Sequence, residues 1–274
     1  MAERFGARMG RDILFGSQNY ARDAFDPSEA RDPGGKWTGG GGGGGGGSGG
    51  GGSEAPKAGA SGGASSGSRR VPGVRASGPD DAAKWRDEIT ATSDLDSIDK
   101  LMAASEINQP DLAKTAEAIA KDIGADLKNP GMKKRERLAE KLARPGKKPQ
   151  RITDAVRLGF DVKAPEHADE VIKKLAEKYP IADEGWVKTP AGYFDRKAMV
   201  TFPNGQMGEV QMWPPGMLEA KEVKGGHTLY EESQKLPKDS PKFREITQKM
   251  VDLYSPVLAA LPPSWNALVG KAGS

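Results

Sequence analysis

The fold of this chain is decided by one stretch, residues 193–213, which reads YFDRKAMVTFPNGQMGEVQMW. It holds two runs with strand character, 193–202 and 207–213, and Pro203-Asn204-Gly205 separates them. Side chains that alternate with a period of two indicate strands, and Asn-Gly between two such runs is a strong hairpin signal. We therefore expect an antiparallel pair of strands, with Glu209 and Gln211 on one face of the second strand.

Further strands and helices are predicted on both sides of this hairpin. Residues 151–162 alternate and predict another strand, and residues 186–188 fit a short one. Amphipathic patterns predict helices over 166–179 and 242–261, and residues 217–236 also have helical character. This order predicts an α+β fold, in which a mixed β-sheet is flanked by helices.

The residues before the first strand predict helices. Asp80 and Asp81 begin one helix, and Ser93 caps a second. A third begins at Asp111 and ends at Gly124, a residue type common just after a helix end. A basic helix is expected over 133–143.

A glycine tract divides the chain. Residues 39–52 are all glycine except Ser48, so they have almost no side chains to bury and nothing offsets the entropy of ordering them. We expect a flexible tether. The predicted division is a short N-terminal segment, a disordered Gly/Ser-rich linker, a helical region, a compact domain and a flexible tail, at 1–30, 31–78, 79–128, 129–262 and 263–274.

Composition excludes several classes of site. The 274 residues include no cysteine, which rules out disulfides, thiolate zinc sites and cysteine nucleophiles. No apolar run has the length of a membrane span, and no signal peptide opens the chain. We expect a cytoplasmic protein without a membrane partner.

Basic residues are concentrated between 128 and 151. This block has ten lysines and arginines, and only Glu136 and Glu140 oppose them. Such a block favours a polyanion as a partner, for example nucleotide phosphates or nucleic acid. A solvated helix face is the alternative reading.

Two carboxylates could form a catalytic site. Glu209 lies in the middle of a predicted strand among apolar neighbours, and Asp154 lies near the start of the strand over 151–162. A carboxylate of this kind can hold Mg²⁺ and accept a proton from an attacking hydroxyl. The alternative is that Glu209 faces water or pairs with Arg196 or Lys197 across the hairpin.

The order of these motifs resembles the synthetase domain of RelA/SpoT proteins, including small alarmone synthetases and phage-encoded relatives. The resemblance covers about residues 131–232, and we assign the domain over 129–262 to it. It rests on Lys133 and Lys141, on Asp154-Ala155-Val156-Arg157, on Gly192-Tyr193, on Glu209-Val210-Gln211, and on a helix with Met217, His227 and Tyr230.

The resemblance implies a Mg²⁺-dependent pyrophosphokinase. Such enzymes transfer the β,γ-pyrophosphate of ATP to the 3′-hydroxyl of GDP or GTP, and toxic relatives use the 3′ end of tRNA. Lys133 and Lys141 would bind ATP phosphates, Arg157 would steady phosphate charge, Tyr193 would stack on the acceptor base, and His227 would contact substrate. Asp154 and Glu209 would bind the metal, and Glu209 would also be the general base.

The sequence departs from the family pattern at substrate-binding positions. Gly131 stands where the family usually has arginine, the Asp154-to-Arg157 spacing is two residues shorter, and Lys197 replaces a common histidine. These departures favour the alternative of a catalytically degenerate nucleotide- or RNA-binding module.

A second resemblance concerns the N-terminal part. Residues 31–38, RDPGGKWT, resemble a short segment found in many phage-encoded structural and accessory proteins. It implies that the N-terminal segment docks to a virion component.

Overall fold

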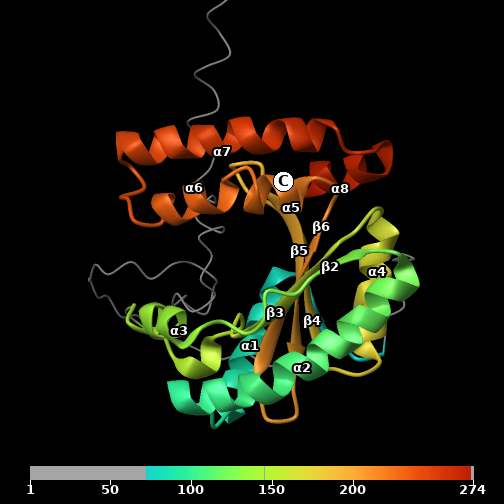
Figure 1. Ribbon diagram of the computed structural model, residues 1–274, viewed down its shortest axis with the longest axis vertical. Coiled ribbons are helices and arrows are strands. Elements are labelled where there is room, and N and C mark those ends of the chain that lie inside the picture. The colour runs from blue at the N-terminus through green and yellow to red at the C-terminus, as the bar shows by residue number, and fades with distance from the viewer. Residues whose placement is uncertain (1–71, 145, 273–274) are drawn as a thin grey trace, which may run out of the picture.

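The computed structural model describes residues 72–144 and 146–272 (Figure 1). The predicted N-terminal segment, the virion-docking motif at 31–38 and most of the predicted linker lie outside the described residues. None of the described helices has both the length and the apolar character needed to cross a membrane.

Six strands form one mixed sheet, in the order β1-β4-β5-β6-β3-β2. Their bounds are β1 Val74–Ser77, β2 Asp126–Lys128, β3 Val156–Asp161, β4 Ile181–Lys188, β5 Phe194–Thr201 and β6 Met207–Trp213. The pairs β1–β4 and β3–β6 are parallel, and the other neighbours are antiparallel. The predicted α+β fold with a mixed sheet is confirmed.

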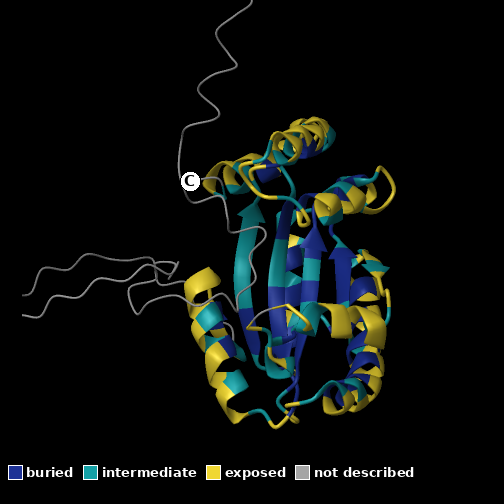
Figure 2. Cartoon of the chain, turned by 90° about the vertical axis from the view of Figure 1, so that its left-hand side faces the viewer, coloured by how far each residue is buried: buried dark blue, intermediate teal, exposed yellow. Residues whose placement is uncertain are grey.

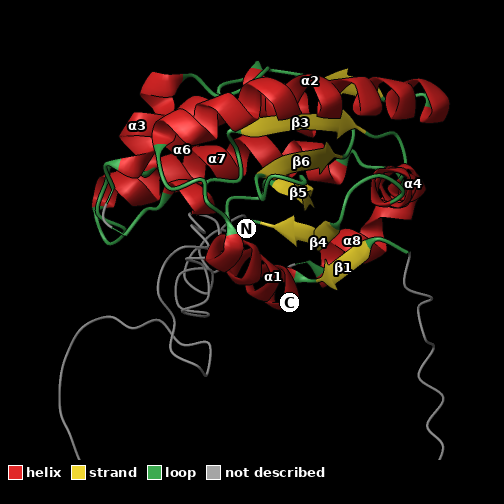
Figure 3. Cartoon of the chain, turned by 90° about the horizontal axis from the view of Figure 1, so that it is seen from below, coloured by secondary structure: helices red, strands yellow, loops and turns green. Residues whose placement is uncertain are grey.

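Helices flank this sheet (Figures 1 and 3). Their bounds are α1 Pro79–Thr92, α2 Ile98–Ile123, α3 Arg135–Leu142, α4 Pro165–Ala176, α5 Met217–Glu222, α6 Gly226–Ser233, α7 Pro241–Ala259 and α8 Asn266–Lys271. In the described part of the chain, short 3₁₀ turns lie at Pro149–Arg151 and Pro263–Trp265.

The predicted hairpin is the pair β5–β6. Thr201 pairs with Met207, and the two strands stay in register as far as Arg196 and Met212. Gly205 adopts a φ of 76°, a conformation that favours glycine in the turn. Helix α2 fixes this turn from outside, because Asn108 donates hydrogen bonds to Asn204 (3.1 Å) and Gln206 (2.7 Å).

One face of the sheet is the core. Leu158 of β3 and Val210 of β6 are fully or almost fully buried, in the same cluster as Leu112 of α2 and Val171 of α4. Alternation places these strand residues on the opposite face from Glu209. That other face is covered at one end by α1, whose Ala82 packs with buried residues of β1, β4 and β5.

The helices before β2 differ from the prediction. A single helix, α2, replaces the two expected after Ser93, and its cap is Ser97, whose side chain accepts from the Lys100 amide. Pro110 lies inside this helix. A proline removes one backbone hydrogen bond and crowds the carbonyl of the residue four positions earlier, and continuous burial along one face of α2 outweighs this cost.

The structure also differs from the predicted division at both ends of the domain. Residues 74–77, expected in the linker, form β1, which pairs with β4. In the expected flexible tail, Trp265 is fully buried, with its ring centroid 5.0 Å from that of Trp186. Burial of the large Trp265 ring orders the C-terminal segment, and pairing with β4 orders residues 74–77.

Gly159 of β3 provides a test of the packing on the face of the sheet that carries Glu209. A Cβ atom built there would lie 2.4 Å from the Trp213 ring and 2.6 Å from the backbone oxygen of Gln211. We expect Gly159→Ala to lower the free energy of unfolding by roughly 1–3 kcal/mol through overpacking. Gly270→Ala is the control, because a Cβ there meets nothing within 4 Å. Urea denaturation that shows equal stability for both variants would contradict this packing.

Candidate functional site

Charged and polar side chains gather on the face of the sheet opposite the core. Glu209 of β6 is in register with Arg157 of β3 and Met199 of β5, and Gln211 is in register with Lys197. Paired residues on neighbouring strands point to the same side of a sheet. These polar residues are partly buried, and Figure 2 shows such stretches of the strands in teal. The predicted placement of Glu209 beside Gln211 is confirmed by the β6 strand.

Glu209 is available for chemistry. Within the described part of the chain, its carboxylate forms no hydrogen bond or ion pair. Arg196, one predicted partner, points to the opposite face, where it binds Asp183 (2.6 Å) and Asp169 (2.6 Å). Pairing of Glu209 with Arg196 is therefore wrong, because the two residues lie on different sides of the sheet.

Two lysines surround Asp154, which lies between the 3₁₀ turn at Pro149–Arg151 and β3. Lys141 Nζ is 3.1 Å from Asp154 Oδ1, and Lys133 Nζ binds Oδ2. Helix α3 positions Lys141 for this contact. Leu138, one turn earlier in the helix, is fully buried and packs in the same apolar cluster as Ile152. The Lys133 amide also donates to the carbonyl of Ala155, at 2.9 Å. The structure thus brings Lys133, Lys141 and Asp154 together.

The charges in this cluster stabilise each other. Burial alone would raise the pKa of Asp154, but the charges of Lys141 and Lys133 outweigh it and lower that pKa to about 2. Burial lowers the pKa of Lys133, and the charge of Asp154 offsets part of this effect. Asp154 is therefore an ionised carboxylate throughout the physiological pH range.

This lowered pKa predicts a change of stability in acid. Asp154 titrates at lower pH in the folded than in the unfolded chain, so its contribution is present above about pH 4 and is lost as pH falls toward 2. The loss should be about 2 kcal/mol. We expect Asp154→Asn to lack this part of the acid destabilisation in urea denaturation at pH 7 and at pH 2.5. An identical acid loss in both proteins would show that the lysines do not hold Asp154 in solution.

Gln109 of α2 positions Arg157. The Arg157 amide donates to Gln109 Oε1 at 3.0 Å, and Gln109 Nε2 donates to the Arg157 carbonyl at 3.2 Å. The side-chain amide of Gln109 thus pairs with the backbone of β3 in the way that a neighbouring strand would. Arg157 Nε is buried and has no hydrogen-bond partner among the described residues. Gln109 was not predicted from the sequence. The signal that could have indicated its role is a polar residue on the apolar side of a helix.

Tyr193 lies in a buried polar group near the end of β6. Its hydroxyl accepts from Trp213 Nε1 (2.6 Å) and donates to Asp195 (3.2 Å). Its ring meets Tyr254 edge-on, with centroids 5.5 Å apart. Burial raises the pKa of Tyr193 well above its ordinary value, so the hydroxyl stays protonated. Stacking of this ring on an acceptor base stays a prediction.

Lys221 of α5 lies over the same aromatic rings and was not predicted from the sequence. Its ammonium is 5.0 Å from the centre of the Trp213 ring and 3.2 Å from Gln211 Oε1. Burial lowers the pKa of Lys221, although the charges of Asp195, Glu222 and Glu209 oppose this shift. Trp213 is only 3% exposed, so Lys221 lies over a ring that belongs to the core.

His227 is placed apart from these groups. It lies on α6 with 52% of its side chain exposed, and its Nε2 is 3.5 Å from Glu231. Glu231 also pairs with Arg137 of α3. No hydrogen bond or ion pair in the described ranges joins His227 to Asp154 or Glu209, so its contact with substrate stays a prediction.

Asp154 and Glu209 are the two metal ligands that the resemblance implies. The described residues contain no group of three or more acidic or histidine side chains that could hold a metal by themselves. Mg²⁺ is commonly bound by one or two carboxylates together with substrate phosphates and water. In the structure both carboxylate oxygens of Asp154 bind lysines, so the binding of Mg²⁺ by Asp154 and Glu209 stays a prediction.

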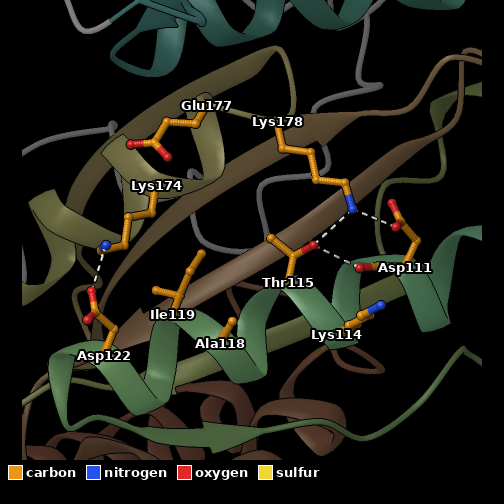
Figure 4. A pocket seen from close by; sticks show the side chains of 9 residues that line it. All are labelled: Asp111, Lys114, Thr115, Ala118, Ile119, Asp122, Lys174, Glu177 and Lys178. Carbon is orange, nitrogen blue, oxygen red and sulfur yellow. Dashed lines mark hydrogen bonds and ion pairs between the residues drawn. The ribbon is translucent and has the colours of Figure 1, made fainter.

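A separate hollow of about 650 Å³ is formed by α2 and α4 (Figure 4). Ion pairs cross it: Lys178 to Asp111 at 2.5 Å and Lys174 to Asp122 at 2.6 Å. None of the site residues predicted from the sequence lines this hollow.

Comparisons with known proteins identify the fold. No protein-family model and no curated sequence matches the chain. Among solved structures, the complex between the Type VI effector Tas1 and its immunity protein matches with 21% identity over 60% of this chain and 97% of that chain, at a TM-score of 0.50.

Two further structures belong to alarmone-related proteins. Small alarmone synthetase 2 from Bacillus subtilis has 13% identity over 63% of this chain and 97% of its own, at a TM-score of 0.45. A GTP pyrophosphokinase family protein from Streptococcus pneumoniae has 15% identity over 69% and 96%, at a TM-score of 0.38. The described residues have the RelA/SpoT-like synthetase fold, as the order of motifs predicted. At these identities the likeness concerns the fold alone.

Proposed function

We propose that this chain transfers pyrophosphate from ATP to the 3′-hydroxyl of a nucleotide, either GDP or GTP or the 3′ end of a tRNA. The observation that carries the proposal is Glu209, a partly buried carboxylate with no ion-pair partner among the described residues. It lies in the middle of the sheet and in register with Arg157. An unpaired carboxylate beside cations is suited to accept a proton while phosphate charge is held nearby.

The reaction follows from these groups. Glu209 accepts the proton of the 3′-hydroxyl, whose oxygen forms a bond to the β-phosphorus of ATP while the bond from that phosphorus to AMP breaks. Phosphoryl transfer depends on positioning and charge stabilisation more than on covalent chemistry. Bound by Asp154 and Glu209, Mg²⁺ would supply charge neutralisation on the phosphate oxygens.

The donor and the acceptor have separate contacts in this proposal. In the structure Lys133 and Lys141 both bind the carboxylate of Asp154. When ATP binds, its phosphates would replace part of these contacts. Arg157 has a buried, unpartnered Nε and would meet the same phosphates. The partly exposed ring of Tyr193, with the Lys221 ammonium 5.8 Å from its centre, would contact the acceptor nucleotide.

A transfer assay tests the proposal. The full chain is incubated with ATP labelled in its γ-phosphate, with Mg²⁺, and with GDP, GTP or bulk tRNA, and the products are separated by chromatography. We expect label to move to one of these acceptors, and chelation of Mg²⁺ to stop it. Nucleotide binding without transfer would favour the binding-module alternative. If neither transfer nor Mg²⁺-dependent nucleotide binding is seen, the proposal fails.

Replacing Lys141 by alanine should weaken ATP binding more than it slows turnover. Lys141→Ala removes one charge-assisted contact to ATP phosphate, in the ground state and in the transition state alike. We expect KM for ATP to rise about tenfold with a smaller change in kcat. Lys134→Ala is the matched control, because Lys134 is exposed at the start of the same helix and forms no ion pair with Asp154 among the described residues. Equal effects of the two substitutions would remove Lys141 from the ATP site.

A further inference from the structure

The side chain of Lys221 on α5 ends beside that of Gln211 on β6. Lys221 Nζ donates to Gln211 Oε1 at 3.2 Å, and it lies 3.7 Å from Glu222 Oε1, which is a longer contact. Only 19% of the Lys221 side chain is exposed. A cation that has given up most of its hydration needs polar partners, and the nearest one among the described residues is the amide oxygen of Gln211.

Packing fixes the position of Lys221. Met217, four residues earlier on the same face of α5, is fully buried, and so is Ala220. The Lys221 ammonium lies 5.0 Å from the centre of the Trp213 ring. That ring lies against Gly159, where a Cβ atom would be only 2.4 Å from it. A strand without a side chain, a core ring and the lysine therefore form successive layers.

The lysine determines which way the Gln211 amide points. An ammonium group has three hydrogen-bond donors and no acceptor, so the oxygen of a side-chain amide must face it. The amide nitrogen, Nε2, then points away from Lys221. A glutamine without such a neighbour can adopt either orientation, because its oxygen and nitrogen occupy nearly the same space. Lys221 therefore makes Gln211 a donor toward the rest of the Glu209 face.

This donor is available to a ligand. In the described part of the chain, Gln211 Nε2 forms no hydrogen bond, and the residue is half-buried. The nitrogen is also not enclosed by protein, because none of the buried side-chain atoms that lack a partner in the described ranges belongs to Gln211. The structure thus holds an oriented donor in reach of solvent.

Gln211 and Glu209 are close enough to contact one nucleotide. They are two positions apart on the same face of β6, which places their Cα atoms about 7 Å from each other. Side chains at this spacing can reach adjacent groups of one small molecule. A hydrogen-bond donor beside a carboxylate that accepts a hydroxyl proton suits a neighbouring oxygen of the same nucleotide.

We propose that Gln211 donates through Nε2 to an oxygen of the acceptor nucleotide close to its 3′-hydroxyl, and that Lys221 is the positioning residue that orients the Gln211 amide for this contact. The contact with the acceptor rests on the proposed function. The orientation of the amide by Lys221 does not depend on it.

NMR tests the orientation without any substrate, in protein labelled with ¹⁵N at the glutamine side chains. Gln211→Ala assigns the Nε2 signals. We expect a restrained amide in the wild type, and shifted signals with a smaller ¹⁵N{¹H} NOE in Lys221→Met, because methionine still packs on the Trp213 ring but has no donor for Oε1. Lys221→Arg should keep the restrained signals. Identical Gln211 signals in the wild type and Lys221→Met overturn the inference.

Two controls separate this effect from damage to the fold. Gln206 is an internal reference, because its Nε2 donates to Ser105 at 2.6 Å in the core, and its signals should stay unchanged. Lys224→Met is the matched control, because Lys224 is 52% exposed just after α5 and pairs with Glu219. A change of the Gln211 signals as large in Lys224→Met as in Lys221→Met would overturn the inference.

A second variant serves if Lys221→Met does not fold. Lys221→Gln keeps a polar side chain, but an amide can either donate or accept, so it selects neither orientation of Gln211. We expect the same loss of restraint in the Gln211 signals. A fully restrained amide in this variant contradicts the role of the ammonium.

Kinetics test the contact with the acceptor. In an active enzyme, Lys221→Met should raise KM for the acceptor about three- to tenfold, the size of one lost hydrogen bond, and leave KM for ATP unchanged. Gln211→Ala should raise the same KM at least as much. In the double variant, Lys221→Met should add nothing, because Lys221 acts through Gln211. Effects that multiply independently would overturn the inference.

These measurements distinguish failure of the inference from failure of the proposed function. An inactive wild type refutes the proposed function, and the NMR signals still decide whether Lys221 orients Gln211. An active wild type in which Gln211→Ala leaves KM for the acceptor unchanged refutes the inferred contact alone.

Discussion

Replacing Glu209 by glutamine should abolish pyrophosphate transfer and leave the fold intact. Glutamine keeps the length of the side chain but removes the negative charge that would bind Mg²⁺ and the base that would accept the 3′-hydroxyl proton. Loss of a general base typically lowers the rate 10²- to 10⁴-fold, and loss of a metal ligand adds to this. Since Glu209 has no ion-pair partner among the described residues, the substitution leaves no described cation without its partner.

The measurement is kcat for transfer from labelled ATP, with unfolding in urea as the check on the fold. Glu177→Gln is the matched control, because Glu177 is exposed at the end of α4, beside the separate hollow. We expect this control to keep wild-type kcat. A Glu209→Gln enzyme within about tenfold of wild type would exclude Glu209 as the base, because even the low end of the usual loss is larger.

Replacing Trp265 by alanine should have the largest effect on stability. Trp265 is fully buried between the sheet and the C-terminal helices, with ring centroids 5.0 Å from Trp186 and 6.5 Å from Phe194. Truncating a buried tryptophan costs roughly 3–5 kcal/mol, from lost burial and from the cavity that remains. The 3₁₀ turn that carries Trp265 and the following α8 should then separate from the sheet.

Urea denaturation and amide exchange in α8 measure this effect. Trp265→Phe is the control, because it keeps an aromatic ring and removes Nε1, which is buried without a partner among the described residues. We expect the phenylalanine variant to lose much less stability than the alanine variant. Equal, small losses for both would mean that residues 263–272 behave as the flexible tail that the sequence predicted.

The hairpin and the strand before it could be predicted because their signals are local. The Asn204-Gly205 turn and the alternation at 207–213 depend on residues close in the chain, and β5 and β6 form as expected. The predicted strand at 151–162 is present as Val156–Asp161. The same alternation placed Glu209 and Gln211 on one face, which the register confirms.

The supporting residues could not be predicted, because each acts on a partner far along the chain. Gln109 binds the backbone of Arg157, which is 48 positions away, and Arg86 binds Glu184, which is 98 positions away. In sequence, both are ordinary polar residues of a helix. The β-bulge of β4 at Glu184 could not be predicted either, because it is defined only by how β4 pairs with β5.

By itself, the sequence determined the period-two pattern of the central strands, the turn between them, and the order of charged motifs that resembles the synthetase family. Tertiary structure decided that residues 74–77 form an edge strand and that Trp265 belongs to the core. It also decided which cations meet which carboxylates: Lys133 and Lys141 bind Asp154, and Arg196 turns away from Glu209. Local patterns set which side of an element is apolar, but the partner of a buried charge depends on which elements pack together.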